Sequence, residues 1–172
     1  FTVTPYDREL EKGLPQKESV IETFRQLSDR IGPKRVIWRY DPILFSQSMD
    51  VSYHLHGFEA IAKRLASCTK TCVISFVDLY QKTRRNLRET TVREPGADEI
   101  TRLASGMAAI ASSYGIRIQT CAERIDLESM GIRHGRCIDR VLNEELQECK
   151  LIDYRDRNQR PQCGCVQSVD NG

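Results

Sequence analysis

The sequence predicts an α/β fold in which strands and helices alternate, with a parallel sheet that forms half or part of a TIM-type barrel. Short runs of strand-forming residues alternate with longer segments whose apolar residues recur every three or four positions. The connections are short, and such units place their strands in parallel with right-handed crossovers. A chain of 172 residues is long enough for one domain with its own core.

The predicted elements divide the chain into two parts. Residues 1–149 are expected to form a partial barrel of four β-α units, and residues 150–172 an irregular tail with a Cys-x-Cys motif. Strands are expected at 1–4, 35–41, 72–80 and 116–123, and helices near 15–31, 51–65, 98–111 and 138–146. The outer strands of such a sheet would lie open. Either the sheet stays small or, as we favour, further strands come from the rest of the protein or from another chain.

Two of these helices carry further expectations. His54 and His56 flank the apolar stripe of the second helix. Side chains two positions apart on a helix do not converge on one metal ion, so both are expected on the helix surface. Asp98 is expected to cap the third helix, and Val141 and Leu142 are expected to face inward from the last one.

The strand at 35–41 carries the first site candidates. Side chains alternate along a strand, so Arg39 and Asp41 share one face while Trp38 and Tyr40 share the other. Functional groups gather at the carboxyl ends of parallel strands. Arg39 and Asp41 are therefore predicted to be site residues, or alternatively to form an internal ion pair that sets the strand register. Pro42 cannot donate to the ladder and is expected to end the strand.

A basic loop follows the third predicted strand and contains Lys82, Arg84, Arg85 and Arg88. Because it begins at the carboxyl end of a strand, it can hold a phosphate or carboxylate group of a cofactor near the mouth of the sheet. A solvated basic loop is the alternative interpretation. A nucleic-acid-binding loop ranks last, because few aromatic residues accompany it.

The cysteines form the most chemically specific pattern. Cys163 and Cys165 lie in a Gly-containing segment, Cys121 ends the last predicted strand, and Cys137 follows in a Gly-rich loop near His134. Thiolates select zinc, copper(I) or iron-sulfur clusters. If the tail folds back over the sheet, these groups can form one metal site, with sulfurs about 3.5 to 4 Å apart around a tetrahedral ion. The other three cysteines are expected to fill space in the core: Cys68, Cys72 and Cys149. The alternative interpretation of the whole set is seven unrelated reduced thiols.

Composition narrows the range of partners. A net charge of +2 gives no overall reason to expect nucleic acid, and no apolar run approaches the ~20 residues that span a bilayer. No signal-peptide pattern opens the chain. We expect a cytoplasmic protein with reduced thiols that acts on a small molecule or another unidentified substrate.

Five motifs occupy residues 36–42, 72–78, 118–123, 134–139 and 158–165. In their sequence and order they resemble the microbial family known as domain of unknown function 1848, and the resemblance covers essentially the whole chain. The resemblance implies a radical S-adenosylmethionine (SAM) type of protein, because members carry a Cys-x3-Cys-x2-Cys motif near their carboxyl terminus. Such motifs bind a [4Fe-4S] cluster together with SAM. This chain stops where that motif is expected next, so we expect it to be an internal fragment that lacks the cluster cysteines.

Carried over onto this chain, the resemblance implies a mouth lined by Arg39, Asp41, Asp78 and Glu123. The cysteine set would then form a second metal site or lie beside the missing cluster. Two functions follow: part of an iron-sulfur, radical SAM-like enzyme, or a non-catalytic zinc-binding module whose thiolates hold the tail across the sheet.

Overall fold

The computed structural model describes residues 1–8, 10–11, 13–77, 91–121, 125–136, 138–147, 150 and 165. In chain order its elements are α1 (Lys17–Ile31), β1 (Trp38–Ile43), α2 (Val51–Leu65), β2 (Thr71–Phe76), α4 (Ala97–Ser113), β3 (Arg117–Cys121), the 3-10 helix η1 (Glu128–Met130), β4 (Arg133–Gly135) and α5 (Arg140–Gln147). None of the described helices is both long and apolar enough to cross a membrane.

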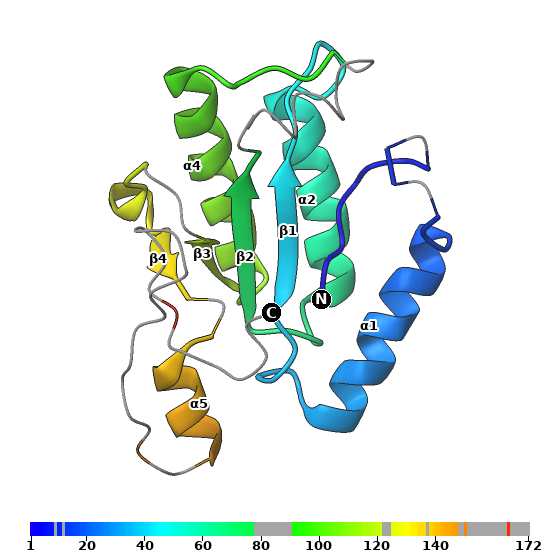
Figure 1. Cartoon of the computed structure of the whole chain (residues 1–172), viewed down its shortest axis with the longest axis vertical. Coiled ribbons are helices and arrows are strands. Elements are labelled where there is room, and N and C mark those ends of the chain that lie inside the picture. Colours follow the sequence, from blue (N-terminus) through cyan, green and yellow to red (C-terminus); the bar gives the residue numbers. More distant parts are fainter. Residues whose placement is uncertain are drawn as a thin grey trace.

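The strands form one parallel sheet in the order β1-β2-β3-β4, so neighbours in the chain are neighbours in the sheet. Helices α2 and α4, which connect β1 to β2 and β2 to β3, lie side by side behind these strands in Figure 1. The predicted α/β alternation and parallel sheet are confirmed. Sequential strands with their helices on one face are also the arrangement of a barrel wall, whereas a doubly wound sheet carries helices on both faces. Closure into a barrel stays a prediction.

The core lies between the sheet and the helices. Trp38 and Tyr40 project from β1 into this layer and meet Phe58 of α2, with ring centroids 4.7 and 5.3 Å from it. Cys72 and Ile74 of β2 lie on the same face and are inaccessible to solvent. Helix α1 joins the core through Ile21, Phe24 and Ser28. The face of the sheet that carries Arg39 and Asp41 is turned away from this layer, and we call it the open face.

The first predicted strand exists only as a short contact. Residues 1–3 run parallel to β1, where Thr2 bridges Arg39 and the amide of Val3 donates to the Arg39 carbonyl at 3.0 Å. Trp38 Nε1 adds a bond of 2.9 Å to the carbonyl of Val3. The segment therefore lies on the outer edge of β1, although it forms one bridge rather than the predicted strand.

The prediction that Pro42 ends the strand is wrong. Strand β1 continues to Ile43, and the register against β2 shifts between Tyr40 and Ile43. In this bulge two β1 residues stand opposite one β2 residue, a position where a strand tolerates proline. As a result Ile43, rather than Pro42, returns to the buried face and pairs with Phe76.

Three further expectations are wrong. Residues Arg133–Gly135, predicted as loop, form strand β4 against β3. The N-cap of α4 is Gly96 rather than Asp98, and the carboxylate of Glu99 accepts from the Gly96 amide at 2.9 Å. Val141 of α5 is 51% exposed rather than inward-facing, because α5 contributes no buried residue to the core. The predicted tail lies outside the described residues except for 150 and 165.

Candidate functional site on the open face of the sheet

Arg39 and Asp41 occupy the open face of β1, as the alternation predicts. Arg39 binds one carboxylate oxygen of Asp41 twice, through Nη2 at 2.5 Å and Nε at 3.2 Å. Their side chains are 29% and 21% exposed, so water still reaches the pair. The structure therefore shows the ion pair that the sequence offered as one alternative, at a position that a ligand can also reach.

The open face continues across the neighbouring strands as two rows of residues, which are polar apart from Val73 and Gly135. In the first row Arg39 stands beside Val73, and Gln119 stands between Val73 and Arg133. In the second, Cys121 pairs with Gly135 of β4. Ser75, Gln119 and Cys121 are all half-buried. The face thus offers hydroxyl, amide, thiol and guanidinium groups where a closed core would have apolar side chains.

Glycine at position 135 makes room for the Gln119 side chain. A Cβ atom at Gly135 would lie 2.6 Å from Gln119 Cδ and 2.7 Å from its Nε2, closer than side chains tolerate. The Gln119 amide therefore lies over the backbone of β4.

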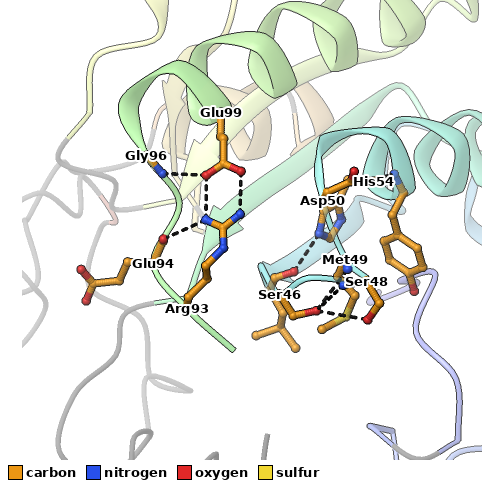
Figure 2. A network of polar contacts seen from close by, with 11 residues as sticks. Ser46, Ser48, Met49, Asp50, His54, Arg93, Glu94, Gly96 and Glu99 are labelled. Carbon is orange, nitrogen blue, oxygen red and sulfur yellow. Dashed lines mark hydrogen bonds and ion pairs between the residues drawn. The ribbon is translucent and has the colours of Figure 1, made fainter. Parts of the chain in front are cut away.

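The carboxyl end of β1 is bordered by two hydrogen-bonded turns, shown in Figure 2. In the first, Ser46 Oγ accepts from the amides of Ser48 and Met49 at 3.2 and 3.1 Å, and Asp50 caps α2 by accepting from the Tyr53 amide. In the second, the guanidinium of Arg93 forms two bonds of 2.6 and 2.7 Å with the Glu99 carboxylate.

The two turns meet because the amide of Arg93 donates to the carbonyl of Phe45 at 2.8 Å, and the guanidinium of Arg93 lies 5.5 Å from the centre of the Phe45 ring. The contact with Arg93 also holds the pKa of Glu99 at about 2. The chain that returns after the basic loop is therefore fastened to the end of β1.

A buried histidine lies close to the carboxyl end of β1. The prediction that His54 lies on the helix surface is therefore wrong. His54 is inaccessible to solvent, with Nε2 2.8 Å from the Leu44 carbonyl and Nδ1 2.9 Å from the Tyr40 hydroxyl. A carbonyl only accepts, so Nε2 carries the proton and Tyr40 donates to Nδ1. Burial lowers the pKa of His54, against smaller opposing effects of the Leu44 carbonyl and Asp50. His56 is exposed as predicted.

Two tyrosines complete this buried network in their neutral form. The hydroxyl of Tyr6 donates to the Pro42 carbonyl at 2.7 Å and accepts from the Leu44 amide at 2.8 Å. Burial raises the pKa of Tyr6 and of Tyr40 well above the usual value of a phenol. Both hydroxyls thus act as hydrogen-bonding groups that shape the bulge at Pro42, rather than as acids at neutral pH.

Many of the predicted site residues lie outside the part of the chain that the structure describes: Asp78, Lys82, Arg84, Arg85, Glu123, Cys137 and Cys163. Of the four predicted metal ligands, Cys121 and Cys165 are described. Within the described ranges, no three His, Cys, Asp or Glu side chains gather closely enough to hold a metal ion. The thiolate site therefore stays a prediction.

The described cysteines other than Cys121 fall into two groups. Cys68 and Cys72 are buried on the helix side, as predicted for space-filling residues, and burial raises the pKa of the Cys72 thiol. Cys165 is 3% exposed, and its sulfur accepts from the amide of Ile138 at 3.5 Å. Ile138 directly follows Cys137, so the one placed cysteine of the tail lies next to a segment that carries another predicted ligand.

The family comparison decides where the chain belongs. The family model described as "Domain of unknown function (DUF1848)" matches residues 1–172. The chain belongs to the DUF1848 family. No curated protein and no solved structure matches it.

In this DUF1848 chain, reasoning from sequence missed His54 and Tyr6, which define the end of β1. A signal for His54 was present. Val51, His54 and Phe58 follow one another at the spacing i, i+3, i+7, which places the histidine inside the buried stripe of α2. No comparable signal marked Tyr6, whose partners are backbone groups 36 and 38 residues further along the chain.

The DUF1848 chain also has an open recess of about 1040 Å³ beside β3 and β4. Open-face residues Thr71, Arg117, Gln119 and Arg133 contribute to it, together with residues of α4 and α5. The recess includes the first residues of β2, β3 and β4, whereas Arg39 and Asp41 do not line it.

Proposed function

We propose that this chain forms the substrate-facing wall of an iron-sulfur, radical SAM-like enzyme of the DUF1848 family. The observation that carries the proposal is the polar open face of a sheet whose connecting helices lie on the opposite face. In barrel enzymes the inward face and the strand carboxyl ends hold the reacting groups. The expected cofactors are a [4Fe-4S] cluster and SAM, which follow from the family resemblance.

In this proposal Arg39 binds a polar group of the substrate. Asp41 positions it, because two bonds to one carboxylate oxygen restrict the guanidinium plane. Cys121 and Gln119 lie on the same face and line the same wall. When bound, the cluster and SAM supply one-electron radical chemistry. Arg39, Asp41, Gln119 and Cys121 bind and orient the substrate.

The test is to purify the full-length protein without oxygen and to measure iron, sulfide and visible absorption. We expect a brown protein that contains iron and sulfide and that cleaves SAM when reduced. Arg39→Gln should weaken substrate binding and leave the iron content unchanged, since Arg39 carries no metal-binding atom. A colourless, iron-free protein would contradict the enzyme proposal.

A second candidate is a zinc-binding module, and the environment of Cys165 favours it. A buried sulfur that accepts a backbone N–H has the surroundings of a coordinated thiolate, because hydrogen bonds to sulfur tune such sites. Cys121, Cys137, Cys163 and Cys165 would supply the ligands. Metal binding there would contribute directly to folding.

Metal analysis separates the two candidates. About one equivalent of zinc without iron supports the zinc module, and Cys165→Ser should then lower both metal content and thermal stability. The matched control is Cys68→Ala, a buried cysteine on the helix side. Unchanged metal content in Cys165→Ser would remove Cys165 from the ligand set.

A further inference from the structure

The recess beside β3 and β4 gathers positive charge. Its lining residues include four arginines: Arg117, Arg133, Arg136 and Arg140. Asp139 is the one carboxylate among its described lining residues, and its Oδ1 accepts from the amides of Val141 and Leu142 at the start of α5. In Figure 1 this region lies at the β3–β4 side of the sheet, with α5 below it.

Most of these arginines have no carboxylate partner among the described residues. Arg140 forms an ion pair of 3.1 Å with Glu144. No side-chain hydrogen bond or ion pair engages Arg117, Arg133 or Arg136 in the part of the chain that the structure describes. Elsewhere, by contrast, Arg39 and Arg93 each bind a carboxylate. The recess therefore concentrates cations that are available to a ligand.

The sheet register brings two of these arginines within reach of one ligand. Arg133 pairs with Gln119, and Arg117 precedes Gln119 by two residues on the same strand, so both arginines lie on the open face. From a strand spacing of about 4.8 Å and a rise of ~3.3 Å per residue, their Cα atoms lie roughly 8 Å apart. Two long side chains at that separation can reach one anion between them, beside the Gln119 amide.

We propose that this recess binds a doubly charged anion of the phosphate class, carried by a small molecule. Guanidinium groups match phosphate oxygens in geometry and form two parallel bonds each. One arginine would be enough to neutralise a monoanion, whereas two neighbouring arginines repel each other and favour a ligand with more than one charge. The recess takes in the first residues of β2, β3 and β4 and excludes Arg39 and Asp41. The proposal therefore goes beyond the iron-sulfur function and holds with or without it.

The experiment titrates the full-length protein with inorganic phosphate at low salt and follows binding by calorimetry. The test variant is the double substitution Arg117→Gln/Arg133→Gln. The control is Arg25→Gln/Arg30→Gln, which removes two exposed arginines of α1 and the same net charge. We expect the test variant to bind phosphate about tenfold or more weakly, because each charge-assisted hydrogen bond that is lost raises the dissociation constant substantially. The control should bind like the parent protein.

Acetate serves as the monoanionic probe and should bind at least about tenfold more weakly than phosphate. If the double variant does not fold, as judged by circular dichroism, Arg133→Gln alone is measured in its place. Three results would overturn the proposal: no phosphate binding by the parent protein, equal weakening in the α1 control, or acetate binding as tight as phosphate binding.

Discussion

Because of the buried histidine of α2, we expect the free energy of unfolding of this protein to fall as the pH is lowered into the mildly acidic range. His54 is neutral in the folded chain because both ring nitrogens are engaged, one by the Leu44 carbonyl and the other by the Tyr40 hydroxyl. The ring is inaccessible to water, and burial lowers its pKa below the ordinary value of 6.5. Two changes therefore test the contribution of this ring to stability: lowering the pH, and the substitution His54→Gln.

The sign follows from which state binds the proton first. The unfolded chain takes up a proton on His54 near pH 6.5, while the folded chain resists until a lower pH. The stabilising contribution of His54 is fully present above pH 6.5 and is lost as the pH falls from there toward the pKa of the folded state. The loss is at most about 1.4 kcal/mol per pH unit. The contribution of Glu99, whose pKa is lowered to about 2, is fully present above its ordinary value of 4.5 and is lost only below it, so it stays constant between about pH 5 and pH 7.

The assay is urea unfolding of the parent protein, His54→Gln and His56→Gln between about pH 7 and pH 5. His56→Gln is the matched control, because His56 is exposed two residues further along the same helix. At neutral pH we expect His54→Gln to cost about 1–3 kcal/mol, since Tyr40 and Leu44 lose well-placed partners. Its stability should then fall less on acidification than that of the parent. A parallel pH profile for His54→Gln and the parent would refute this reasoning.

Two further predictions concern packing and the open face. Gly57→Ala should lower the free energy of unfolding by about 1–3 kcal/mol although alanine favours helices, because the new Cβ would lie 2.5 Å from Pro5 Cβ. Gly106→Ala, whose Cβ would meet the flexible side chain of Leu55, should cost less stability in the same urea titration. If Gly57→Ala were as stable as the parent, the packing argument would be contradicted. A double-mutant cycle of Arg39→Gln and Asp41→Asn should give a coupling of about 0.5–1 kcal/mol, as expected for a partly exposed ion pair. A coupling near zero would show that the pair adds nothing to stability.

Local periodicity explains which expectations the structure confirms. The two-residue period of a strand placed Arg39 and Asp41 together on one face and Trp38 and Tyr40 on the other, and the structure shows this arrangement. The 3.6-residue period located α2 and α4 closely. Both patterns depend on neighbours in the sequence and need no knowledge of distant contacts.

Where distant contacts decide, the expectations are wrong. Strand β4 has only three residues, one of them glycine, and exists because β3 provides hydrogen-bonding partners. Pro42 stays within β1 because the bulge against β2 accommodates a residue without an N–H. His54 is buried because the Leu44 carbonyl and the Tyr40 hydroxyl satisfy its nitrogens. The predicted contributions of Cys137, Cys163, Asp78 and Glu123 stay predictions.

By itself, the sequence determined the alternation of helices and strands, the parallel sheet, and the face on which the Arg39–Asp41 pair lies, because each depends on periodic patterns within a short segment. Only the tertiary structure decided which face stays open, which histidine is buried and which arginines share a recess. Those outcomes depend on strand register and on partners tens of residues away. Hydrogen bonding and burial act on such partners only after the chain has folded.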